Sequence, residues 1–260
     1  MAAAAGHLRG KRTVVGSLIA VIGGTGLNTM PGFQIASQQQ VETRWGLPSA
    51  PLQRGSLDGV ELVFLARHGA GHTTAPHAIN YRANIQALKD VGVSAVIAIN
   101  AVGGIRDDYP PASVGVPDQL IDYTSGREHS FCGAGEPLQH IDFTEPFDPG
   151  LRSQLLAAAE AAAVGVVVDG TVAVTNGPRL ETAAEIRKYQ RDGCDLVGMT
   201  SMPEAALAKE AGLVYASIAV SVNYAAGMGS GDIHAEIEQS VADGMAKVQK
   251  ILSKLVAASA

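Results

Sequence analysis

Short apolar runs alternate with longer alanine-rich stretches along the chain. Valine, isoleucine and leucine dominate the short runs, and six of these predict β-strands, at residues 18–22, 61–66, 94–100, 171–175, 195–199 and 214–222. Several are apolar at nearly every position, which is typical of strands buried on both faces of a parallel or mixed sheet. Helices are predicted between them, at residues 78–91, 151–163, 181–191, 203–211 and 234–257. The pattern therefore predicts an α/β fold in which helices flank a mixed β-sheet.

Residues 103–148 interrupt this alternation. They contain glycine, proline, histidine and aromatic residues and predict a broad loop region, of the kind that builds binding sites or subunit contacts. No repeat or linker divides the sequence, and 260 residues fit one large domain, which we expect over residues 18–260. Residues 1–17 are basic and predict a disordered extension, with a targeting peptide as the alternative.

Composition narrows the class of protein. The formal net charge is −6 and only 17% of residues are charged, so we expect no nucleic-acid partner, which would require a basic patch. No apolar run reaches the roughly 18 residues of a membrane span, so we expect no membrane partner. Cys132 and Cys194 are too few for a disulfide framework and fit a reducing compartment, which favours a cytoplasmic protein.

The first candidate site is the glycine turn in "LIAVIGGTGL", residues 18–27. Such a turn presents backbone N–H groups to an anion. The dinucleotide fingerprint fails here, because Thr29 replaces its third glycine and Pro31 prevents the long helix that must follow. The triphosphate loop fails as well, since no Gly-Lys-Ser/Thr follows. A small anion site that includes the Thr25 hydroxyl remains, and a tight turn without a ligand is the alternative.

Polar residues also follow another predicted strand, in "FLARHGAGH". Arg67 and His68 stand directly after the apolar run, where sites in such sheets lie, and the arginine side chain offers a planar donor fork suited to phosphate. A solvated surface pair is the alternative interpretation. His68, His72 and His77 match no zinc spacing and no acid or cysteine completes a ligand set, so we expect no metal.

Two further strands end in small or hydroxylated residues. "NAVGG", residues 100–104, follows one strand and "VGMTSMPEAALA" follows another. Thr200 and Ser201 precede the helix predicted to begin at Pro203, where hydroxyl groups ordinarily act as caps. Capping is therefore the alternative to a binding role for both.

Five segments together resemble one family. They are "VIGGTGL", "LARHGAGHTTAPHAINYRANI", "NAVGGI", "TNGPRLETAAEI" and "GMTSMPEAALAKEAGLVYASIAVSVNYAAG", which are similar to the trimeric purine nucleoside phosphorylases and closest to the methylthioadenosine/methylthioinosine phosphorylase branch. The similarity runs from about Leu18 to the final helix. It implies cleavage of a purine nucleoside by orthophosphate in purine salvage, without metal or organic cofactor. It also implies a homotrimer, although some relatives assemble further.

The resemblance implies a phosphate site beneath the sugar. It is formed by Thr25, Arg67, His68, Asn100, Ala101 and Thr200, with Met199 under the ribose. The transition state resembles an oxocarbenium ion, so an anion held on one face of the sugar stabilises the developing positive charge while the base leaves on the other. Among these residues, His68 also counts as catalytic.

The resemblance also places base recognition in "SVNYAAG" and "GPRLET". Asn223 and Ala225 replace the two aspartates of the adenine-specific branch. A carboxamide donates to a 6-oxo group and accepts from N7–H, and Glu181 matches a glutamate that accepts N1–H, so both favour hypoxanthine or guanine. Asn223 and Glu181 are therefore expected to be catalytic and substrate-binding. The alternatives are a strand-end turn for Asn223 and an acid in the first helical turn for Glu181.

The sequence does not decide whether the sugar of the substrate carries a 5′-methylthio group or a 5′-hydroxyl group. Ile233 and Ile237 could flank a methylthio group, whereas His234 resembles a histidine that meets a 5′-hydroxyl. His140, in "LQHIDFTEPF", matches a residue that a neighbouring subunit donates in the methylthio branch. S-methyl-5′-thioinosine, inosine and guanosine are all candidate substrates, and methylthioadenosine is the least expected. A hydrolytic nucleosidase and a purine-binding module without catalysis are the alternative classes.

Overall fold

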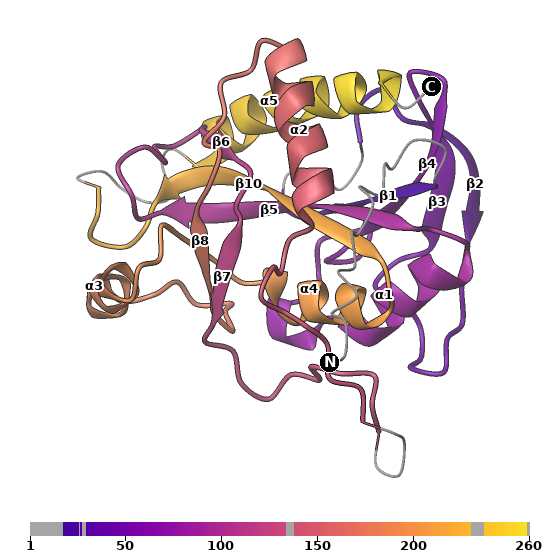
Figure 1. Ribbon diagram of the computed structural model, residues 1–260, viewed down its shortest axis with the longest axis horizontal. Helices are drawn as coiled ribbons and strands as arrows, with labels where there is room; N and C mark the ends of the chain where they lie inside the picture. Colours follow the sequence, from indigo (N-terminus) through magenta and orange to yellow (C-terminus); the bar gives the residue numbers. More distant parts are fainter. Residues whose placement is uncertain (1–17, 26, 28–29, 134–137, 230–236, 259–260) are drawn as a thin grey trace, which may run out of the picture.

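The computed structural model describes residues 18–25, 27, 30–133, 138–229 and 237–258. Its centre is a mixed sheet flanked by helices, as expected (Figure 1). The ten strands are β1 (Ile19–Gly23), β2 (Gln34–Gln39), β3 (Leu52–Leu57), β4 (Val60–Ala66), β5 (Ala95–Gly104), β6 (Val114–Gly115), β7 (Gln119–Asp122), β8 (Thr171–Val174), β9 (Leu196–Gly198) and β10 (Val214–Tyr224).

The strand order is β2-β3-β4-β1-β5-β9-β8-β7, and β10 pairs with both β5 and β6. β1 runs parallel to β4 and β5, and β10 runs parallel to β5 over most of its length. The carboxyl ends of these four strands therefore meet in one region, which is where ligands bind in open α/β sheets. The end of β5 bends into a short antiparallel pairing with β9, which brings β8 and β9 to the same region.

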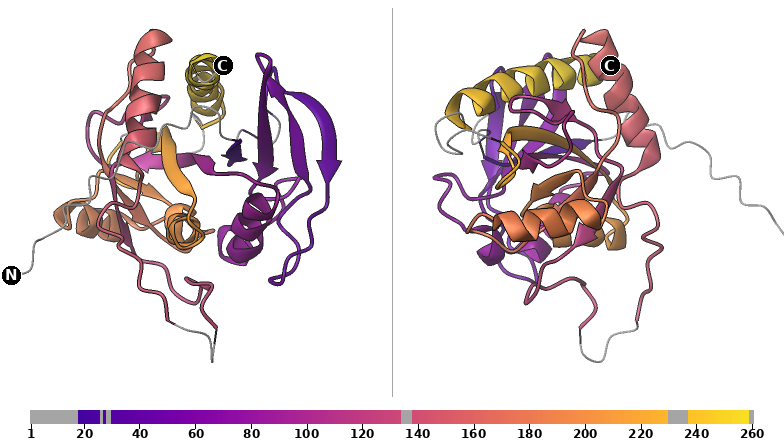
Figure 2. Two further views of the ribbon diagram at one scale, coloured as in Figure 1. Left: turned by 45° about the vertical axis from the view of Figure 1, so that its right-hand side comes forward. Right: turned by 90° about the vertical axis from the view of Figure 1, so that its left-hand side faces the viewer.

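Five α-helices and one short 3₁₀ helix are described. They are η1 (Pro76–Ala78), α1 (Tyr81–Asp90), α2 (Pro149–Ala161), α3 (Ala183–Arg191), α4 (Ser201–Glu210) and α5 (Ile237–Ala257). α2 and α5 lie on one side of the sheet, and α1 and α4 lie on the other (Figures 1 and 2). Asn80, Asp148 and Thr182 cap three of the helices, each accepting a backbone N–H with its side chain.

The core confirms the hydrophobic pattern. All five residues of β1 are buried, and so are nine of ten in β5, because helices or other strands cover both faces of these strands. The six predicted strands are all present. None of the helices in the described part of the chain combines the length and the apolar character needed to cross a bilayer.

Four strands were not predicted. Every residue of β2 is exposed, so it shows no apolar run, and β3 contains Gly55 and polar residues. The prediction of loop over residues 103–148 was wrong in part, because β5 extends to Gly104 and β6 and β7 lie within the segment. The described residues between β7 and α2, 123–133 and 138–148, do run away from the sheet as irregular segments (Figure 1). The N-terminal prediction for residues 1–17 lies outside the described residues.

Candidate active site

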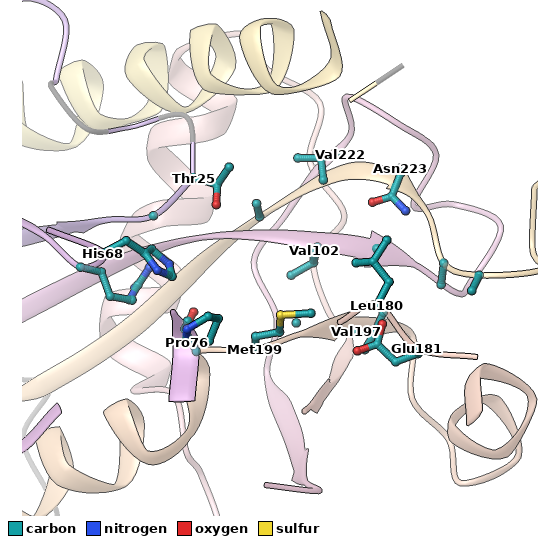
Figure 3. Close-up of a pocket in the computed structure, with 18 residues that line it drawn as sticks. Thr25, His68, Pro76, Val102, Leu180, Glu181, Val197, Met199, Val222 and Asn223 are labelled. Carbon is teal, nitrogen blue, oxygen red and sulfur yellow. The ribbon is translucent and has the colours of Figure 1, made fainter. Parts of the chain in front are cut away.

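One cavity opens at the carboxyl ends of the central strands. Including the open solvent at its mouth, it encloses about 760 Å³. The cavity is lined by eight short stretches of the chain, which are 24–25, 67–68, 76, 101–103, 180–181, 197–200, 222–223 and 225–226. Thr25 and His68 lie at one end, and Asn223 and Glu181 lie at the other (Figure 3). Met199 lies between the two ends, so the predicted base residues share one cavity with all of the predicted phosphate residues except Asn100.

Arg67 is completely buried, so the interpretation as a solvated surface pair is wrong. Its Nε and Nη2 donate to the two carboxylate oxygens of Glu204, at 2.7 and 2.8 Å. Nη1 donates to the Ile99 carbonyl, and Nη2 also donates to Asn100 Oδ1. Burial alone would lower the pKa of Arg67, but the charge and hydrogen bonds of Glu204 outweigh burial and raise it. The guanidinium is therefore always charged, and the described residues accept four of its five N–H groups.

The glycine turn packs directly on this guanidinium. A Cβ atom on Gly24 would lie 2.9 Å from Arg67 Nη1 and 2.7 Å from the Ile99 carbonyl oxygen. The backbone of Arg67 also donates to Gly23, at 3.0 Å, which joins the ends of β1 and β4. Nη1 carries the N–H that the described residues leave unpaired, so the turn and the arginine together form one positive wall of the cavity.

His68 presents a lone pair to this wall. Its Nδ1 lies 2.8 Å from the Thr74 carbonyl oxygen, which can only accept, so Nδ1 carries the proton. Burial lowers the pKa of His68 to about 4 and keeps the imidazole neutral at pH 7. The His72 ring packs against it, with 4.5 Å between ring centroids, and His72 Nε2 lies 3.4 Å from the Thr25 hydroxyl. Among the described residues no three His, Cys, Asp or Glu side chains gather as a metal site.

Asn100 lies behind the cavity wall. Its Oδ1 accepts from Arg67, and its Nδ2 donates to Ser201 Oγ at 2.8 Å and to Thr200 Oγ at 3.4 Å. Asn100 therefore orients neighbouring groups that do line the cavity. Thr200 is the residue before α4, but its side chain makes no capping hydrogen bond, so the capping interpretation is wrong for its hydroxyl. Ala101 lines the cavity next to these groups.

A bulge near the end of β10 aims Asn223 into the cavity. The register of β10 against β5 shifts between Ser221 and Asn223, so two consecutive residues, Val222 and Asn223, line the same cavity. The Asn223 Nδ2 donates to the Tyr224 carbonyl at 2.6 Å, which fixes how the amide is turned. Asn223 lies within β10 and not in a turn, and Ala225 lines the cavity two residues later.

Glu181 lies in the loop between β8 and α3. The predicted helix 181–191 begins at Ala183 instead, with Thr182 as its cap, so Glu181 precedes the helix and the first-turn interpretation is wrong. One Glu181 carboxylate oxygen accepts from the Thr175 hydroxyl, with 2.7 Å between the oxygens. The carboxylate lies on the cavity wall, below Asn223 in the view of Figure 3.

Not every expected residue reaches this cavity. Ile237, the first residue of α5, is not on its wall, and His140 is exposed in the segment between β7 and α2. His234 lies outside the described residues. The apolar wall residues Pro76, which begins η1, and Leu180, in the loop before α3, were not predicted, because neither lies in a stretch with a periodic pattern. Leu180 directly precedes Glu181, and its position next to that predicted site residue was the one indication in the sequence that it lines the cavity.

Comparison with known proteins agrees with this geometry. The family model described as the phosphorylase superfamily matches residues 18–257. The chain belongs to the phosphorylase superfamily. A relative from Xanthomonas campestris pv. campestris, named probable S-methyl-5′-thioinosine phosphorylase, is 52% identical over 212 residues, which cover 81% of this chain and 85% of the relative.

Other members of the superfamily extend the comparison. A probable 6-oxopurine nucleoside phosphorylase from Thermococcus kodakarensis is 40% identical and covers 92% of this chain and 91% of its own. The solved methylthioadenosine phosphorylase from Schistosoma mansoni in complex with adenine has a TM-score of 0.88 at 33% identity, covering 93% of this chain and 91% of that one. The predicted resemblance and the α/β phosphorylase fold are confirmed.

Proposed function

We propose that this chain is a phosphorylase of 6-oxopurine nucleosides, which cleaves the N-glycosidic bond with orthophosphate and releases a purine base and a ribose 1-phosphate. The observation that carries the proposal is the single cavity that joins an anion-binding end, with Thr25 and Arg67, to a base-binding end, with Glu181 and Asn223. The relatives' names support the same class of reaction.

The anion end holds the attacking group. The charged Arg67, the hydroxyls of Thr25 and Thr200 and the Ala101 segment surround the space where phosphate binds. His68 offers an acceptor nitrogen there, which suits the P–O–H group of a protonated phosphate. A phosphate fixed below the sugar stabilises the positive charge that develops on it as the bond to the base breaks. No metal or organic cofactor is part of this proposal.

The base end recognises a 6-oxopurine. The Asn223 amide keeps one N–H for the 6-oxo group, because the other donates to Tyr224, and its oxygen accepts from N7–H as the base leaves. The Glu181 carboxylate accepts N1–H. Adenine has a lone pair at N1, so the same carboxylate disfavours it.

Among 6-oxopurine nucleosides we propose S-methyl-5′-thioinosine as the preferred substrate. Four relatives named for that activity are 49–52% identical to the chain and a fifth is 41% identical. A relative named S-methyl-5′-thioadenosine phosphorylase is 41% identical, and two named for 6-oxopurine nucleosides are 39–40% identical. We further propose a cytoplasmic homotrimer acting in purine salvage. His140, exposed and away from this chain's cavity, then approaches the 5′ end of a neighbour's substrate.

A substrate panel tests the function. Purified protein is incubated with S-methyl-5′-thioinosine, inosine, guanosine and S-methyl-5′-thioadenosine, each with and without phosphate. Release of hypoxanthine only with phosphate, fastest from S-methyl-5′-thioinosine, supports the proposal. Equal release without phosphate indicates a hydrolase, and binding without release indicates a purine-binding module. Scattering in solution measures whether the particle is a trimer.

A further inference from the structure

Glu181, whose carboxylate is proposed to bind the purine base, lies on an exposed loop. Residues 178–180 are exposed and Glu181 itself is half-buried, so the backbone that carries it has few packed neighbours. Sites on loops are less well positioned than sites on strands or helices. A carboxylate that distinguishes N1–H from a bare N1 needs a fixed direction, because the distinction depends on a single hydrogen bond.

Thr175 supplies a rigid donor for that carboxylate. It directly follows β8 and is 8% exposed. Its N–H donates to the Gly198 carbonyl at 2.9 Å, and its carbonyl accepts from Arg127 at 3.2 Å. The branched side chain has little freedom about χ1. The hydroxyl therefore stays in one place, 2.7 Å from Glu181 Oε1.

A second, smaller cavity adjoins the same carboxylate. Glu181 lines both cavities, and Arg179 and Tyr189 are on the wall of the smaller one. The Arg179 guanidinium is hydrogen-bonded to Glu185, which raises the pKa of Arg179 most, and the charge of the nearby Glu181 adds a smaller attraction that raises it further. Without a holding group, the carboxylate has a second place to turn, away from the base. The Thr175 hydroxyl opposes that turn.

We propose that Thr175 is a positioning residue that sets the base specificity of this enzyme. By donating to Oε1 it directs the other oxygen of Glu181 toward the N1–H of the purine. Thr175 does not touch the substrate, because it is not on the wall of the active-site cavity. The inference rests on the proposed function, since it assigns Glu181 to the base.

The test compares two variants of Thr175. Thr175→Val keeps the shape and removes the hydroxyl, and Thr175→Ser keeps the hydroxyl. Thr175→Val is expected to lower kcat/KM for the 6-oxopurine nucleoside about tenfold, as for loss of one hydrogen bond to a charged group, and to leave kcat/KM for its 6-amino counterpart unchanged or raised. In Thr175→Val the KM for phosphate is expected to stay within about twofold of wild type. In Thr175→Ser the kcat/KM for each nucleoside and the KM for phosphate are expected to stay within about threefold of wild type.

A double-variant cycle separates positioning from packing. In a Glu181→Ala background the added Thr175→Val change is expected to alter the residual rate by less than about twofold, because the carboxylate it acts through is gone. Three results overturn the proposal: equal losses in Thr175→Val and Thr175→Ser, equal losses on both nucleosides, or a full additional loss in the Glu181→Ala background.

Failure of the proposed function gives a different result. If wild-type protein releases no base from any nucleoside, calorimetric titration with hypoxanthine replaces the rate assay. Thr175→Val then weakens hypoxanthine binding about tenfold and Thr175→Ser does not, and equal affinities in the two variants overturn the role of Thr175.

Discussion

Breaking the buried ion pair beneath the anion site tests what holds the cavity together. Arg67 and Glu204 are both fully buried and share two hydrogen bonds, and Tyr215 adds a third, from its hydroxyl to Glu204 Oε1 at 2.8 Å. Glu204→Gln keeps the shape of the side chain and removes its charge. The guanidinium of Arg67 then stays charged and buried without a counter-ion. The new NH₂ group of the glutamine also replaces one of the two oxygens that accept from Arg67, so two N–H donors face each other.

The expected loss is large. Removing one partner of a buried ion pair costs about 3–5 kcal/mol. For a chain of this size each kcal/mol lowers Tm by roughly 2–4 °C, so Glu204→Gln should melt about 10 °C below wild type. The KM for phosphate should also rise, because the guanidinium that faces the phosphate loses its main anchor.

The exposed Arg54–Glu61 pair provides the matched control. Its side chains are 47% and 57% exposed, so solvent screens the pair and Glu61→Gln should lower the free energy of unfolding far less than Glu204→Gln. Both variants are unfolded thermally and in urea at one protein concentration, because assembly makes Tm depend on concentration. If Glu204→Gln unfolds within about 1 kcal/mol of wild type, the ion pair does not stabilise the site and this reasoning is refuted.

Three further predictions follow from the cavity. Asn223→Asp should lower cleavage of 6-oxopurine nucleosides and raise that of adenine nucleosides, and an unchanged preference in the substrate panel would remove Asn223 from base recognition. Gly24→Ala should raise the KM for phosphate at least tenfold by displacing Arg67, whereas Gly165→Ala, with open space at its Cβ, should leave the kinetics unchanged; similar kinetics in the two would contradict the close packing. Burial lowers the pKa of His68 to about 4, so the unfolded chain takes up a proton at this residue below about pH 6.5 and stability falls toward pH 4. The difference in free energy of unfolding between wild type and His68→Gln should therefore be smaller at pH 5 than at pH 7 in urea titrations, and a difference independent of pH would contradict the buried, neutral imidazole.

The central strands were predictable because most of their residues are buried. The sequences of β1, β5 and β10 are therefore largely apolar, and the polar exceptions are Asn100, Ser217, Ser221 and Asn223. β2 could not be found in this way, since it is exposed at every residue and pairs through its backbone alone. An apolar pattern indicates which strands are buried, so an exposed strand at the edge of the sheet cannot be predicted from it.

The site was predictable in part for a related reason. Polar residues at the ends of buried strands, such as Arg67 and Thr200, stand out against their apolar neighbours. The partners of these residues do not stand out, because Glu204 faces Arg67 only after α4 packs on the sheet. The hydrogen bond from Thr175 to Glu181 depends on how residues 176–180 fold back between them, which no local sequence pattern indicates.

The shift in β10 divides one strand into two parts with different constraints. Up to Ser221 each side chain is held by the packed interior, so exchange there disturbs the whole sheet. Beyond the shift, Asn223 and Ala225 both line the cavity, but Asn223 is partly exposed, whereas Ala225 is buried in a second, smaller core cluster. Another polar side chain of similar size at position 223 therefore leaves the pairing of β10 with β5 in place, whereas a larger side chain at position 225 must displace packed neighbours.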